Sequence, residues 1–135
     1  SYFGDDGLPA FLAHSEILIC LLPLTNATTG IVNAKLLSQL PKNSVFINCA
    51  RGGHVVDDDL LAALDQNHLS KVVLDVFNTE PLPTDHPYWK HPKVTVTPHI
   101  AALTAPHSGA KYVAENIRRI ESGEVPMNLI DLDPF

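Results

Sequence analysis

Short apolar runs alternate with polar segments along the chain, and four of these runs have the length of a single β-strand. In the first run, EILICLLP, apolar residues follow one another without alternating polar positions, which predicts a strand buried on both faces. We therefore predict four strands, over residues 16–23, 44–50, 71–77 and 93–98.

Helical patterns fill the segments between and after these strands. Asn33 can cap one helix, and either Asp57 or Asp58 can cap another, because a short polar side chain accepts hydrogen bonds from the free N–H groups of a first turn. The predicted helices lie at residues 8–12, 33–41, 57–67 and about 104–122.

Strands that alternate with helices indicate an α/β fold, with a doubly wound parallel sheet covered on both sides. The sheet pattern ends near residues 102–104, where the long last helix begins, and Gly123 is a natural stop for that helix. One face of this helix is apolar and consists of Val113, Ile117 and Ile120. We place the only domain boundary at the start of this helix.

Composition and charge narrow the possible partners. A formal net charge of -6 over 135 residues disfavours nucleic acid, whose binding proteins present a basic face. The longest apolar run, ILICLLPL, is far shorter than the roughly 20 residues that span a bilayer, so we also predict no membrane partner. Cys20 and Cys49 lie inside apolar runs. Their placement favours buried free thiols in a reducing compartment, the cytoplasm, although a disulfide between them stays open.

Polar side chains follow the carboxyl ends of the predicted strands, where open parallel sheets bind their ligands. We expect four of them to converge on one rim: Arg51, Asp75, Glu80 and His99. The two glycines after the arginine would let the backbone turn and leave room for a ligand. Arginine pairs with carboxylates, histidine moves protons near neutral pH, and a neighbouring glutamate fixes the imidazole ring. Such a set suits the reduction of a 2-oxo acid, although the hydride donor is not visible in these residues.

The loop between the last two predicted strands is rich in proline and histidine. Asp85, His86 and His91 suggest a metal site, but their spacing matches no compact ligand set, and we predict no metal. Tyr88 and Trp89 are interpreted as anchors of this loop. Cys49 is interpreted as a packing thiol without a covalent role.

Four segments, taken together and in order, resemble the D-isomer-specific 2-hydroxyacid dehydrogenase family: LLPLTNATTGIV, INCARGGHVVDDDLLAAL, VVLDVFNTEPLP and VTPHIAA. The segment HPYWKHPKVTVTPHIAA is most similar to the glyoxylate/hydroxypyruvate reductase branch. The resemblance implies an NAD(P)-dependent enzyme that reduces small 2-oxo acids to D-2-hydroxy acids. It also implies a homodimer, with NADP slightly favoured over NAD.

The resemblance assigns roles by position. Arg51 matches the substrate-binding arginine, His99 the catalytic acid/base, and Glu80 its glutamate partner. Asp75 matches the aspartate near the nicotinamide carboxamide. The positions that match the cofactor cleft are Leu22, Pro23, Thr28, Cys49, Ala50, Arg51, Asp75, His99 and Ala101.

The family's glycine-rich G-x-G-x-x-G turn has no counterpart in this sequence. We therefore expect residues 1–103 to be the C-terminal part of a Rossmann-like dinucleotide-binding domain. Residues 104–135 would form a helix and tail that return to a substrate domain. The 135 residues alone should be inactive or nearly so. Two other hypotheses stay open, namely a dinucleotide-sensing, corepressor-like protein without turnover and an assembly module that associates with itself.

Overall fold

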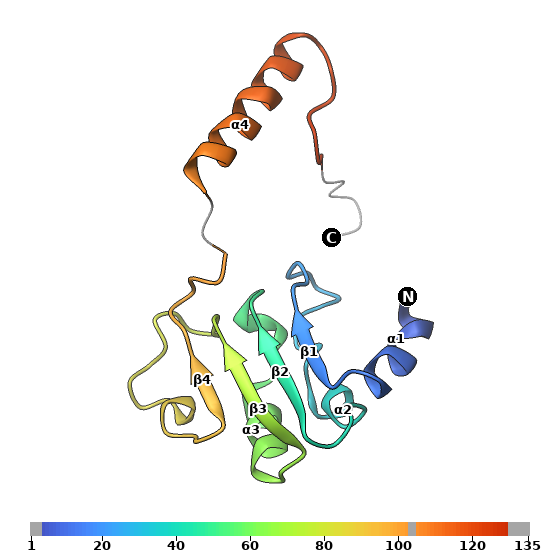
Figure 1. The fold of residues 1–135 in the computed structure, drawn as a ribbon, viewed down its shortest axis with the longest axis vertical. Coiled ribbons are helices and arrows are strands. Elements are labelled where there is room, and N and C mark those ends of the chain that lie inside the picture. The colour runs from blue at the N-terminus through green and yellow to red at the C-terminus, as the bar shows by residue number, and fades with distance from the viewer. Residues whose placement is uncertain (1–3, 103–104, 130–135) are drawn as a thin grey trace. The chain divides into compact units, whose positions relative to one another are not determined.

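One parallel sheet forms the centre of the first unit of the chain. The computed structural model describes residues 4–102 and 105–129, which divide into two units between Ala101 and Ala102. The sheet has the order β1-β2-β3-β4, with every neighbouring pair parallel (Figure 1). Its strands are β1 (Ile17–Cys20), β2 (Ser44–Asn48), β3 (Leu69–Leu74) and β4 (Val94–Val96). The predicted α/β fold class with a parallel sheet is confirmed.

One α-helix precedes the first strand and two others connect the first three strands, as the sequence pattern predicts. The first unit contains α1 (Gly4–Ala13), α2 (Ala34–Leu37) and α3 (Asp57–Asp65), and the second contains α4 (Pro106–Glu121). Two short 3-10 helices that the sequence did not reveal are η1 (Gly52–His54) and η2 (Pro87–Trp89). Among the described residues, no helix combines the length and apolar character needed to cross a membrane.

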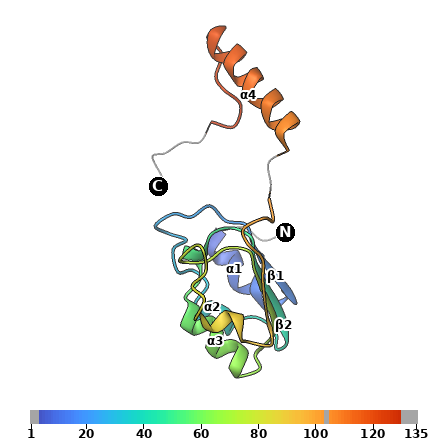
Figure 2. The same cartoon turned by 90° about the vertical axis from the view of Figure 1, so that its left-hand side faces the viewer.

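The core lies between one face of the sheet and the helices α2 and α3 (Figure 2). Alternate strand residues point into it, because side chains along a strand alternate between the two faces. The sheet contributes Leu18, Cys20, Phe46, Val72 and Leu74, and the helices contribute Leu36, Leu37, Leu60 and Leu64. Cys20 is buried, Cys49 is half-buried, and both are free thiols.

The prediction that the first strand is buried on both faces is wrong for β1 as the structure has it. Ile17 is 60% exposed and Ile19 is 52% exposed, whereas Leu18 and Cys20 between them are buried. The reason is that β1 is the first strand of the sheet order, and α2 and α3 cover only the face of Leu18 and Cys20. An uninterrupted apolar run therefore does not show which of its two faces will be covered.

Two of the predicted helix ends are confirmed and one is wrong. The Asn33 side chain accepts a hydrogen bond from the Leu36 N–H at 3.2 Å, as an N-cap should. Gly123 follows Ser122, the C-cap of the last helix, and its φ of +79° suits a helix stop. Helix α3, however, begins at Asp57 after Val56, with no side-chain cap.

The carboxylate of Asp57 binds the loop before β4 instead of capping α3. The Tyr88 hydroxyl donates to Asp57 Oδ1 at 2.8 Å, and the Asn78 amide donates to Asp57 Oδ2 at 2.9 Å. Tyr88 is buried, and this burial, reinforced by the hydrogen bond and charge of Asp57, raises the pKa of its phenol. The phenol therefore remains a donor, and Tyr88 anchors the loop as predicted, while Trp89 is exposed.

We predict that Tyr88→Phe lowers the free energy of unfolding by about 1.5–3 kcal/mol, because it removes a hydrogen bond to a charged group at a buried position. Urea unfolding followed by circular dichroism measures the change. Tyr112→Phe is the matched control, because its hydroxyl bonds the Met127 carbonyl oxygen at the exposed surface of the other unit. Equal losses in the two variants would contradict the anchoring role of Tyr88.

Candidate active site

The loops at the carboxyl ends of the strands carry the side chains that the sequence singles out. Arg51 follows β2, Asp75 and Glu80 follow β3, and His99 follows β4. Because the strands are parallel, these ends meet at one edge of the sheet. The structure brings these residues together to different degrees.

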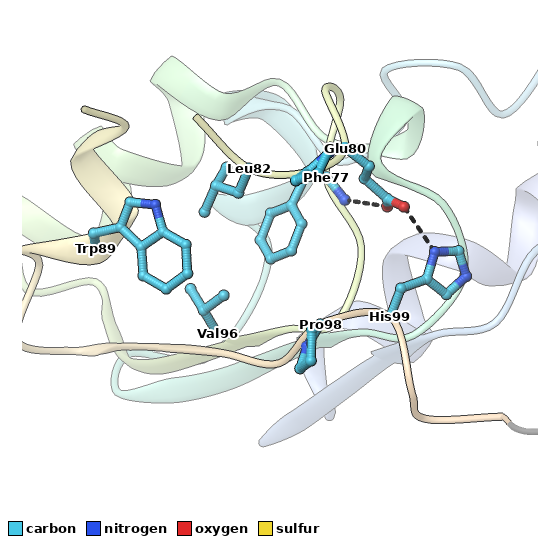
Figure 3. A pocket seen from close by; sticks show the side chains of 8 residues that line it. Phe77, Glu80, Leu82, Trp89, Val96, Pro98 and His99 are labelled. Carbon is cyan, nitrogen blue, oxygen red and sulfur yellow. Dashed lines mark hydrogen bonds and ion pairs between the residues drawn. The ribbon is translucent and has the colours of Figure 1, made fainter. Parts of the chain in front are cut away.

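Glu80 and His99 form the closest pair of this set. Glu80 Oε2 lies 2.8 Å from His99 Nδ1, and Glu80 Oε1 accepts the Phe77 N–H at 2.9 Å (Figure 3). The bond to His99, then the Phe77 N–H and the positive charges of His99 and Arg51, lower the pKa of Glu80. An ionised Glu80 favours a proton on Nδ1 and leaves Nε2 to exchange a proton with a ligand.

Asp75, directly after β3, is only 2% exposed. Its Oδ1 accepts hydrogen bonds from the Thr97 hydroxyl and the Ile100 N–H, and its Oδ2 accepts the Ala101 N–H at 2.8 Å. Burial would raise the pKa of Asp75, but these three hydrogen bonds and the nearby charge of His99 outweigh it and lower the pKa.

The donors to Asp75 stand on both sides of His99, which adopts a φ of +53°. This left-handed conformation is uncommon for a residue other than glycine. Both carboxylate oxygens of Asp75 are therefore engaged in holding the turn that presents His99. The predicted contact of Asp75 with a nicotinamide carboxamide stays a prediction.

Arg51 lines a cavity of 540 Å³. Its guanidinium donates to the carbonyl oxygen of Ala50 at 2.6 Å, and its charge contributes to the lowered pKa of Glu80. Five of the residues that line this cavity were predicted to face a cofactor, namely Leu22, Pro23, Cys49, Ala50 and Arg51. Its lining consists of Leu21, Leu22, Pro23, Leu24, Cys49, Ala50 and Arg51.

Thr28 and Ala101, also predicted to face the cofactor, make internal contacts in the structure. The Thr28 hydroxyl donates to Pro23 O at 2.7 Å and accepts the Thr25 N–H at 2.8 Å, so it shapes the loop after β1. The Ala101 N–H is used by Asp75. Neither residue lines the cavity at Arg51.

An apolar cavity of 630 Å³ adjoins the Glu80–His99 pair. In Figure 3, Phe77, Leu82 and Val96 stand on one side of Pro98 and the pair lies on the other. The lining consists of Phe77, Glu80, Pro81, Leu82, Trp89, Val96, Pro98 and His99.

The glycine after Arg51 serves packing rather than leaving space for a ligand, as the sequence had suggested. A Cβ on Gly52 would lie 1.9 Å from the carbonyl carbon of Phe77 and 2.1 Å from its oxygen. Gly52 therefore allows the backbone of the loop after β3 to press against η1. The expectation of free space is wrong here because another loop fills it.

Asn48 is a structural residue of the site that sequence reasoning missed. It is fully buried, and its amide donates to Arg51 O at 3.0 Å while its oxygen accepts the Ala50 N–H at 3.0 Å. The signal was present as one polar residue inside an otherwise apolar run. Asn48 fixes the turn in which Arg51 stands.

The histidines of the loop before β4 contact separate carboxylates. Nε2 of His86 lies 3.9 Å from Oδ2 of Asp57, and Nε2 of His91 lies 3.3 Å from Oδ1 of Asp65. Within residues 4–102 and 105–129, no group of three or more metal-ligating side chains comes together.

The parallel sheet, its helices and the polar groups at its carboxyl edge define an α/β domain of the dinucleotide-binding class. The chain belongs to the D-isomer specific 2-hydroxyacid dehydrogenase family, because the model of that family's NAD binding domain matches residues 2–101. The resemblance seen in the sequence is thereby confirmed.

Relatives within this family are similar over almost the whole chain. The glyoxylate/hydroxypyruvate reductase A of Photorhabdus laumondii is 50% identical over 132 residues, which cover 98% of this chain and 42% of that protein. The chain therefore spans less than half the length of this curated relative.

Solved structures agree with this comparison. A D-isomer specific 2-hydroxyacid dehydrogenase from Xanthobacter autotrophicus Py2, in complex with NADPH and MES, matches with a TM-score of 0.91 and 48% identity, over 95% of this chain and 53% of that one. An NADPH-dependent glyoxylate/hydroxypyruvate reductase from Sinorhizobium meliloti, in complex with NADP and sulfate, matches with a TM-score of 0.89 and 41% identity, over 96% of this chain and 42% of that one.

We predict that Gly52→Ala destabilises the chain by about 1–3 kcal/mol, because the new methyl group overlaps the Phe77 backbone, which cannot rotate away. Gly53→Ala is the control, since its Cβ would meet only the Leu24 side chain, at 3.1 Å. Urea unfolding of both variants checks this. A Gly52 variant as stable as the Gly53 variant would contradict the close packing of the two loops.

We predict that Asp75→Asn costs about 1–3 kcal/mol at neutral pH, because the amide cannot accept from all three donors. The lowered pKa of Asp75 means that its contribution is present above the unfolded value of about 3.9 and is lost as the pH falls through the folded-state pKa. The gap between wild type and variant should therefore close in acid.

The measurement is the urea midpoint of wild type and Asp75→Asn from pH 7 down into the acid range. Asp85→Asn, at an exposed loop position, is the control and should leave the pH dependence unchanged. A stability gap for Asp75→Asn that stays constant with pH would contradict the ionised, hydrogen-bonded carboxylate.

Proposed function

We propose that the whole protein is an NAD(P)-dependent oxidoreductase that reduces glyoxylate, hydroxypyruvate or similar 2-oxo acids to D-2-hydroxy acids. The observation that supports this most directly is the Glu80–His99 pair, with Nδ1 of the ring held at 2.8 Å by a carboxylate. Proton transfer to a carbonyl oxygen needs a group of this kind.

The side chains divide the work as follows. His99 donates a proton from Nε2 to the substrate carbonyl oxygen, and Glu80 steadies the imidazolium and its orientation through Nδ1. Arg51 pairs with the substrate carboxylate through its planar guanidinium. A bound nicotinamide dinucleotide supplies the hydride.

The chain's own residues fit one wall of a site for such a cofactor. The cavity of 540 Å³ at Arg51 lies at the carboxyl edge of the sheet, and its walls combine apolar residues such as Leu22 and Pro23 with the guanidinium of Arg51. Relatives bound to NADPH and NADP support a preference for NADP over NAD. No G-x-G-x-x-G turn is present in the sequence to bind the pyrophosphate.

For this reason we propose that the 135 residues alone are inactive or nearly so. A homodimer in the cytoplasm, with no nucleic acid or membrane partner, completes the proposal. The alternative of a dinucleotide-sensing protein without turnover is not favoured, because the relatives carry the names of reductases and dehydrogenases.

We predict that His99→Asn in the whole protein lowers kcat with glyoxylate and NADPH by about 10²–10⁴-fold, the usual contribution of a general acid. Asparagine tolerates the left-handed backbone of position 99, so the turn should persist and NADPH binding should change little. Steady-state kinetics and fluorescence titration with NADPH check the two halves.

His91→Asn is the control for this experiment, because His91 lies on the loop before β4 and contacts Asp65 instead. It should keep wild-type kcat. Comparable losses of turnover and of NADPH affinity in the His99 variant would contradict the acid/base role.

A further inference from the structure

His54 is a buried titratable residue that the proposed reaction leaves without a role. It is the last residue of η1, three positions after Arg51, and its side chain is 0% exposed. Both ring nitrogens face backbone carbonyl oxygens: Nδ1 lies 2.9 Å from Arg51 O, and Nε2 lies 3.2 Å from Pro23 O. A fully buried side chain with both polar atoms engaged is fixed in orientation.

The two contacts of the ring differ in how far apart the contacting residues lie in the sequence. The contact with Arg51 O stays within one turn, and that oxygen also accepts from the Asn48 amide at 3.0 Å. The contact with Pro23 O joins residues 31 positions apart, from the loop after β2 to the loop after β1. A carbonyl oxygen only accepts and a neutral imidazole carries a single N–H, so the bond to Pro23 O belongs to the tautomer with its proton on Nε2.

These two loops are the walls of the cavity at Arg51. Leu22 and Pro23 stand on the first wall, and residues 49–51 on the second. Backbone hydrogen bonds also join the loops, from Gly30 N to Gly53 O and from Val32 N to His54 O, both at 2.9 Å. Those bonds hold residues 30–32. The carbonyl oxygen of Pro23 accepts the Thr28 hydroxyl at 2.7 Å from within its own loop, and the His54 ring contacts it from the loop after β2.

We propose that His54 is a positioning residue that sets the separation of the two walls of this cavity and thereby the affinity for the nicotinamide dinucleotide. The inference rests on the proposed function for its ligand but not for its geometry. His54 touches no reacting atom; it acts through Pro23 and the backbone of Arg51.

A pair of amide variants separates the two contacts. In His54→Asn the side-chain amide stands near the position of Nδ1 and keeps only the local contact, while in His54→Gln it reaches towards the position of Nε2 and can still donate to Pro23 O. We expect His54→Asn in the whole protein to raise the Kd for NADPH by roughly two- to tenfold, which corresponds to the loss of one hydrogen bond. His54→Gln should restore most of the affinity.

His68→Asn is the matched control. The His68 ring also contacts a backbone carbonyl 31 positions away, Leu37 O at 2.9 Å, but His68 immediately precedes β3, at the other ends of the strands. Its loss should lower stability as the His54 change does and leave the Kd for NADPH unchanged. A purely structural role of His54 would make the two asparagine variants alike in this readout.

Amide hydrogen exchange of Leu21, Leu22 and Leu24, the residues around Pro23 that carry an amide hydrogen, supplies a second readout that needs no cofactor. Exchange should be faster in His54→Asn than in His54→Gln, His68→Asn and wild type. Unchanged exchange in this segment, or equal NADPH affinity in the His54→Asn and His68→Asn proteins, would overturn the inference. If wild type binds no NADPH, the proposed function is wrong. The exchange measurement would still show whether His54 fixes the position of the loop at Pro23.

Discussion

The geometry of the candidate site depends on one buried carboxylate. Asp75 accepts three hydrogen bonds from the segment that carries His99, and it does so from the end of β3, a central strand of the sheet. Burying a charge is costly unless donors replace the lost water, and here a hydroxyl and two backbone N–H groups do so. The left-handed backbone of His99 persists because the residues on both sides of it are held.

The other loops at the carboxyl edge are fixed by contacts with one another. The backbone of Phe77 presses on Gly52, the Asn78 amide reaches both Val55 O and Asp57, and Tyr88 closes the same cluster from η2. Each contact joins segments that follow different strands. A side chain such as Glu80 therefore keeps its place through packing that lies outside the reacting groups, as a preorganised site requires.

The sequence predicts much of this arrangement, because strand and helix patterns are local. The strand positions, the Asn33 cap, the stop at Gly123 and the proximity of Glu80 to His99 all follow from periodicity, capping chemistry or motif resemblance. The failures concern contacts between distant segments. Neither the use of Asp57 by Tyr88 nor the filling of the space at Gly52 can be read from neighbouring residues, since each depends on how two loops meet.

Burial on one face of β1 was beyond sequence reasoning for a related reason. An apolar run indicates that both faces of a strand can be buried, but whether they are buried depends on which other segments pack against the strand. The same limit applies to His54, whose position in an otherwise polar turn gave no hint of the carbonyl groups that its ring would meet.

Trp89 gives the apolar cavity beside His99 an optical property. It is the single tryptophan of the sequence, its side chain is 53% exposed, and its indole N–H donates to Pro83 O at 2.8 Å. Because Trp89 lines that cavity, the tryptophan emission of this chain arises from one indole at a defined place. Shifts in its wavelength or quenching would thus report the polarity of this cavity without a label, and only of this part of the molecule.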